Sequence, residues 1–122
     1  MESHARDLCA INGMQLLYTA DERLNDIRLS LEQRKNIYLI FKEALNNALK
    51  YSQASAITIS IVQNNGQLKL EVADNGKGFQ SNGSVRGNGL KNMELRAKEI
   101  HASLLIGSVP NKGTSVQLNC PV

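Results

Sequence analysis

The sequence predicts an α/β fold of two layers, in which an antiparallel-rich sheet is covered by helices. Two stretches, residues 31–51 and 90–100, carry apolar residues at helical spacing. Turn-forming residues at 64–66 and 110–113 each separate two short apolar runs, which favours antiparallel neighbours. The apolar runs, most of which alternate with polar residues, predict four strands: 57–61, 68–72, 104–106 and 116–120.

Length and composition exclude several classes of protein. A chain of 122 residues predicts one domain over residues 1–122, and 42% hydrophobic with 20% charged residues is ordinary globular composition. A net charge of +3 is too small to indicate a nucleic-acid partner. No stretch approaches the roughly 18 apolar residues of a membrane span, and the start lacks a signal-peptide core. The two cysteines, Cys9 and Cys120, lie at opposite ends of the chain and form no CxxC motif. They predict reduced structural thiols in a cytoplasmic domain.

The first thirty residues carry the weakest pattern. Residues 2–10 fit a short leading helix, and 15–18 and 27–29 fit short strands with a turn at 21–22 between them. From Ser30 the pattern is clearer, because Ser30 and Gln33 have the spacing of a capping box. We therefore expect a long helix from this point to about residue 51.

One polar stripe runs along this long helix. Glu43, Asn47 and Lys50 are spaced at i, i+4 and i+7, and Asn36 and Asn46 fall close to the same side. Oxygen donors followed by an ammonium group suit a hard cation such as Mg²⁺ bound to phosphate. A solvated polar face, which any amphipathic helix has, is the alternative. The paired asparagines favour a function, because Asn is a poor helix former.

Two glycine-rich segments follow the predicted strand 68–72. Segment 74–78 (DNGKG) places a carboxylate at a strand end, where it can accept a hydrogen bond from an amino group such as that of adenine. A plain Asn-Gly turn is the alternative. Segment 87–90 (GNGL) opens the second helix and offers unpaired N–H groups to an anion, with Arg86 adding charge. A flexible linker is the alternative there. The spacing fits neither a Rossmann fingerprint nor a P-loop.

Four segments in order, FKEALNNALKYS, VADNGKGF, RGNGLKNMELRAKEI and PNKGTSVQL, closely resemble the catalytic ATP-binding domain of two-component sensor histidine kinases. That domain belongs to the Bergerat-fold ATPases, together with gyrase, heat-shock chaperone and mismatch-repair ATPases. The resemblance covers residues 11–122 and is most similar to the nitrate-sensor type. It implies a mixed, mostly antiparallel sheet covered on one face by about three helices. Residues 74–92 would form the nucleotide-binding loop and the ATP lid, and residues 1–10 a leading helix or a remnant.

The resemblance also implies roles for single residues. Glu43 matches the acidic residue that orients or polarises water near the γ-phosphate, and Asn47 matches the residue that coordinates Mg²⁺. Lys50 and Tyr51 match a pair near the phosphates, where this kinase type often has His at the second position. Asp74 matches the residue that reads adenine. Further matches shape the adenine pocket, contact the nucleotide or close over the triphosphate: Gly76, Gly78, Arg86, Gly87, Gly89, Leu90 and Thr114.

Two departures from the family pattern stand out. His101-Ala102 replaces a frequent Gly-Gly after the second helix, where only a helix cap is expected to change. The dimerisation hairpin that carries the phosphoacceptor histidine is not found, and neither His4 nor His101 fits that role. We therefore expect a catalytic domain that is cut from, or works apart from, a longer kinase.

The resemblance implies ATP and Mg²⁺ as ligands. It implies as partners a histidine-bearing dimerisation domain, in the same or another chain, and a response regulator. It implies no contact of this domain with nucleic acid or membrane, although the parent kinase can be membrane-anchored. Two alternatives remain open: a free-standing serine kinase of the anti-sigma-factor type, and a nucleotide-binding module without kinase activity.

Overall fold

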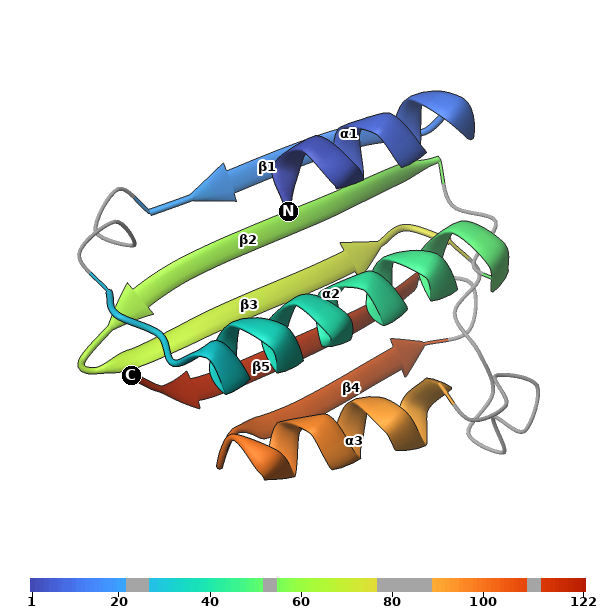
Figure 1. Ribbon diagram of the computed structural model, residues 1–122. Helices are drawn as coiled ribbons and strands as arrows, with labels where there is room; N and C mark the ends of the chain where they lie inside the picture. Colours follow the sequence, from blue (N-terminus) through green and yellow to red (C-terminus); the bar gives the residue numbers. More distant parts are fainter. Residues whose placement is uncertain (22–26, 52–54, 77–88, 110–112) are drawn as a thin grey trace.

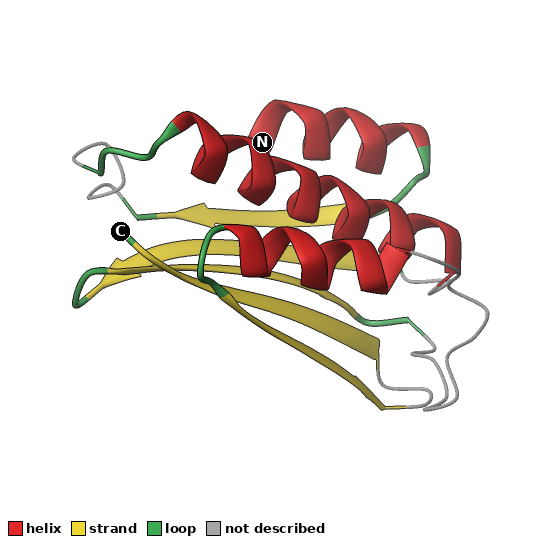
Figure 2. Ribbon diagram, turned by 60° about the horizontal axis from the view of Figure 1, so that its bottom comes forward, coloured by secondary structure: helices red, strands yellow, loops and turns green. Residues whose placement is uncertain are grey.

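The computed structural model describes residues 1–21, 27–51, 55–76, 89–109 and 113–122. Within these residues, three helices lie over one face of a five-stranded sheet (Figure 1). Figure 2 shows the helices and the strands as two separate layers. The predicted two-layer α/β architecture is therefore confirmed. The elements along the chain are α1 (Glu2–Ile11), β1 (Gln15–Ala20), α2 (Leu31–Tyr51), β2 (Ala56–Asn64), β3 (Gln67–Asp74), α3 (Gly89–Glu99), β4 (Ser103–Val109) and β5 (Gly113–Pro121).

The sheet is mixed and mostly antiparallel, as the resemblance implied. Its strand order is β1-β2-β3-β5-β4, with β1 parallel to β2 and the other neighbours antiparallel. Successive side chains of a strand point to opposite faces, so the alternating runs bury one face and expose the other. Ile59, Leu70 and Leu118 are almost completely buried. On the opposite face of the sheet, which the helices do not cover, Gln117 donates a hydrogen bond of 2.6 Å to Glu71.

The N-terminal region follows the sequence expectation in two of its three elements. Helix α1 buries Ala5 and Cys9, which are four residues apart, and β1 begins at Gln15 as expected. The strand predicted at 27–29 is wrong. Ile27 and Leu29 are half-buried against the core, but they pair with no strand of the described chain. Burial of alternate side chains does not make a strand by itself, because a strand also needs a neighbouring strand to pair with. Residue 22 of the predicted turn lies outside the described residues.

Helix α2 begins with the predicted capping box. The Gln33 N–H donates to Ser30 Oγ at 3.0 Å, and the Ser30 N–H donates to Gln33 Oε1 at 2.9 Å. Gln33 Nε2 also donates to the carbonyl oxygen of Pro121 at 3.2 Å, which ties the start of α2 to the end of β5. The helix has 21 residues and lies over the sheet, running roughly along the strands (Figure 1), with Phe41 and Leu45 almost completely buried.

Two tight connections depend on left-handed backbone conformations. Asn65 and Gly66, between β2 and β3, have φ of 53° and 76°, as a type I′ hairpin turn requires. After α3, His101 has φ of 57°. The N–H groups of His101 and Ala102 donate to the carbonyl oxygens of Lys98 and Ala97, the bond pattern of a Schellman cap. The His101-Ala102 departure thus falls at a helix cap, as expected.

Candidate functional site

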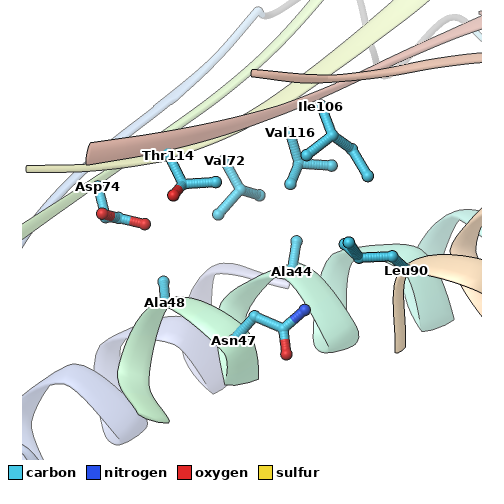
Figure 3. A pocket seen from close by; sticks show the side chains of 9 residues that line it. All are labelled: Ala44, Asn47, Ala48, Val72, Asp74, Leu90, Ile106, Thr114 and Val116. Carbon is cyan, nitrogen blue, oxygen red and sulfur yellow. The ribbon is translucent and has the colours of Figure 1, made fainter. Parts of the chain in front are cut away.

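A cleft opens between α2 and the ends of β3 and β5 that lie near the start of α3. It holds about 280 Å³ of space that atoms do not fill, counting space open to solvent. Figure 3 shows Asp74 and Thr114 pointing from the sheet toward α2, with Ala44 and Ala48 facing them. The cleft is lined by Ala44, Asn47, Ala48, Val72, Asp74, Leu90, Ile106, Thr114 and Val116.

Asn47 supplies the amide group of the helix wall. Its side chain is only 6% exposed, and its Nδ2 atom has no hydrogen-bond partner among the described residues. An unpaired buried donor costs about 1–3 kcal/mol of stability. Ala44 and Ala48 leave room on both sides, because each carries only a methyl group. The arrangement is therefore one in which a ligand would satisfy a protein group that folding leaves unpaired.

Asp74 and Thr114 supply the polar groups of the sheet wall. Asp74 is the last residue of β3, and its Oδ1 accepts a 2.9 Å hydrogen bond from the N–H of Gly76, which is buried. Thr114 is on β5, one residue before Ser115, which pairs with the residue before Asp74. Because the strands are antiparallel, Thr114 and Asp74 lie side by side at the same edge of the sheet.

The structure places the other predicted site residues in three ways. Leu90, in the first turn of α3, lines the cleft. Lys50, Tyr51 and Gly89 belong to helix ends by their backbone, and the side chains of Lys50 and Tyr51 are not described. The predicted site residues outside the described chain are Gly78, Arg86 and Gly87.

Glu43 does not line the cleft that Asn47 lines. It borders a second groove between α2 and α3, together with Asn46 and Arg96, which holds about 550 Å³ when space open to solvent is counted. Residues four positions apart diverge by about 40° around a helix, and residues of α3 line both the cleft and this groove. Asn36 lines neither of these hollows. Its Nδ2 donates a 3.0 Å hydrogen bond to Glu99, which links α2 to α3. The polar stripe therefore divides among three environments.

Sequence reasoning missed the apolar lining and the support of Asp74. Val72, Val116 and Ile106 carry no mark that separates them from ordinary core residues. Asn75, which was predicted only as part of a turn, makes several hydrogen bonds to the start of β2. The Asn-Gly dipeptide was the available signal, but it indicates a turn wherever it occurs.

Both cysteines are free and buried, and burial raises the pKa of the Cys9 and Cys120 thiols. No helix within the described residues has the length and apolar character that a membrane crossing requires. Within the same residues, no group of three or more His, Cys, Asp or Glu side chains could hold a metal ion.

A mixed five-stranded sheet under three helices, with an amide and a carboxylate lining one cleft, is the arrangement that the motifs predicted for an ATP-binding domain. The chain belongs to the family of histidine kinase-, DNA gyrase B- and HSP90-like ATPases, which matches residues 32–122.

Among characterised relatives, the sensor histidine kinase LiaS of Bacillus subtilis is 36% identical over 101 residues, which are 81% of this chain and 28% of LiaS. The sensor protein VraS of Staphylococcus saprophyticus is 38% identical over 88 residues, which are 71% of this chain and 25% of VraS. The chain thus spans little more than a quarter of these relatives.

Solved structures share the fold. The histidine kinase domain of the blue-light activated histidine kinase EL346 from Erythrobacter litoralis superposes with a TM-score of 0.82 at 21% identity, over 98% of this chain and 58% of that one. Full-length ShkA in complex with AMPPNP gives a TM-score of 0.78 at 15% identity, over 98% of this chain and 28% of that one.

Proposed function

We propose that residues 1–122 are a single ATP-binding catalytic domain of a histidine kinase. In this proposal, it delivers the γ-phosphate of Mg-ATP to a histidine on a separate dimerisation domain. The observation that carries the proposal is one cleft lined by the buried Asn47 amide and the Asp74 carboxylate. Support comes from two relatives, one named a sensor histidine kinase and the other a sensor protein.

The adenine ring would lie at the sheet side of the cleft. An ionised carboxylate offers about four lone pairs, so Asp74 can accept from an exocyclic amino group as well as from Gly76. The flat faces of a purine suit the apolar side chains of Val72, Val116 and Ile106. Thr114 lies beside Asp74 and would hold the ring through water, as the family match implies.

The triphosphate and Mg²⁺ would lie toward Asn47. Its side-chain oxygen is a ligand type that Mg²⁺ prefers, and its unpaired Nδ2 can donate to a phosphate oxygen. Mg²⁺ usually takes only one or two protein ligands and fills the rest with phosphate and water, so a single amide is sufficient. When bound, the ion neutralises charge that develops on the phosphates. Lys50, Tyr51, Arg86 and the lid glycines Gly87 and Gly89 are proposed phosphate contacts.

Glu43 would act from the groove between α2 and α3, beside the cleft. Two roles are open to it: accepting the ring proton of the incoming histidine, or ordering water near the γ-phosphate. A pH profile of phosphotransfer separates them. A proton acceptor gives an acidic limb that disappears in Glu43→Gln, whereas a water-ordering residue leaves the profile unchanged in shape.

The same proposal also gives the next partner in the signalling pathway and the location of the domain. A response regulator would receive the phosphate from the histidine, and the domain would work in the cytoplasm. The nitrate-sensor type stays a prediction, which none of the comparisons tests.

Two measurements test the proposed function. Titration of the chain with fluorescent ATP should saturate at micromolar to millimolar concentrations and should depend on Mg²⁺. Incubation with γ-labelled ATP and a separately prepared histidine-bearing dimerisation domain should then label that domain. Absence of saturable binding contradicts the proposal. Labelling of a protein serine instead, or binding without any transfer, would favour the anti-sigma-type kinase or the inert module.

A further inference from the structure

The backbone that carries Asp74 is held on one side by Asn75. Oδ1 of Asn75 accepts hydrogen bonds from the N–H groups of Ser55 and Ala56, both at 3.0 Å. Its Nδ2 donates to Ser55 Oγ at 3.0 Å, and its own N–H donates to the Ala56 carbonyl at 3.3 Å. Residue 55 is itself fixed, because its carbonyl accepts from the N–H of Gln15 in β1. One side chain thus connects the end of β3 to the start of β2 just beyond their last paired residues.

The same backbone is held on its other side by Gly113. This glycine is buried at the start of β5 and has φ of +106°. A Cβ atom placed on it would lie 2.0 Å from the Asp74 carbonyl oxygen and 3.2 Å from Cα of Asn75. Real Cβ atoms do not approach so closely, so any side chain at 113 would displace the peptide between residues 74 and 75. Only glycine allows β5 to pack against this peptide.

These contacts fix where the carboxylate points. A hydrogen bond to an amino group forms over a narrow range of distances, and a displacement of about 1 Å can cost a hundredfold in a positioned interaction. On the basis of the proposed function, we propose that Asn75 and Gly113 are positioning residues for Asp74. They would set the domain's preference for adenine without touching the base.

The test compares ATP with inosine triphosphate, which has a carbonyl oxygen in place of the exocyclic amino group. In the full chain, Asn75→Ala should weaken ATP binding about tenfold and leave inosine triphosphate binding nearly unchanged, since only the amino group can donate a hydrogen bond to Asp74. Asn75→Asp keeps the Oδ1 atom that accepts from the N–H groups of residues 55 and 56, and it should restore the preference for ATP to within about threefold. Gly113→Ala should resemble Asn75→Ala.

The matched control is Gln33→Ala at the opposite end of α2. It also removes several hydrogen bonds, to Ser30 and Pro121, far from the cleft. It should lower the melting temperature and keep the preference for ATP. If Asn75→Ala lowers only the melting temperature and keeps the same ratio of ATP to inosine triphosphate affinity, the positioning role is wrong. If the parent chain itself fails to prefer ATP, the proposed function fails, and this inference fails with it.

Discussion

Replacing Asp74 by Asn should reverse the base preference of the cleft. The present carboxylate accepts the Gly76 N–H through Oδ1 at 2.9 Å. In Asp74→Asn the amide oxygen must keep that role, because an NH₂ group cannot accept. The amide NH₂ is therefore directed into the cleft, where it meets the exocyclic amino group of adenine donor to donor.

The size of the effect follows from the lost interaction. A hydrogen bond to a charged acceptor contributes about 1.5–3 kcal/mol. This corresponds to a rise in the Kd for ATP of about 10- to 150-fold. Inosine triphosphate presents an acceptor at the same place, so its Kd should stay constant or fall.

Isothermal titration of parent and variant with both nucleotides measures this change directly, with a thermal melt to confirm that the variant is folded. An equal loss of affinity for ATP and inosine triphosphate would refute the reasoning. It would mean that Asp74 acts through general charge or local structure and does not read the amino group.

Three further predictions concern the remaining features of the domain. Asn47→Leu should abolish the Mg²⁺ dependence of ATP binding while leaving the melting temperature equal or higher, because it removes an unpaired buried donor; a Mg²⁺ dependence like that of the parent contradicts this. His101→Gly should raise the free energy of unfolding by about 1 kcal/mol, or roughly 3–5 °C in melting temperature, because glycine adopts φ of 57° without strain; an unchanged melt argues against a strained cap. Burial raises the pKa of the Cys9 and Cys120 thiols above 9.0, so unfolded thiols lose protons that folded ones keep. Urea unfolding should therefore show stability falling as pH rises through about 9, and less so in the double Cys→Ala variant; parallel pH profiles contradict this.

Local patterns predicted most of the fold. The capping box at Ser30, the Asn65-Gly66 turn and the alternating strands depend on neighbours in sequence, and each is confirmed. The strand at 27–29 was wrong because strand formation needs a partner, and the partner of an extended segment is set by the whole topology. Spacing along the helix likewise could not show that Glu43 and Asn47 border different hollows.

The shared location of two candidate site residues was predictable from the motifs. Asn47 and Asp74 come from segments 27 residues apart, and the sheet and α2 bring them to one cleft as the motifs implied. The support of Asp74 was not predictable, because the closeness of Gly113 to residues 74 and 75 arises from pairing between β3 and β5. The apolar lining of the cleft, Val72, Ile106 and Val116, could not be predicted either, because core residues and pocket residues are of the same types.

Nuclear magnetic resonance on the labelled chain, with ATP and with Mn²⁺ in place of Mg²⁺, offers the most direct test of a shared nucleotide cleft. The account predicts that ATP shifts the backbone signals of residues 74–76 and 114. It also predicts that paramagnetic Mn²⁺ broadens the side-chain amide of Asn47 only when ATP is present. Shifts confined to the open sheet face around Glu71 and Gln117, with a sharp Asn47 amide throughout, would contradict it.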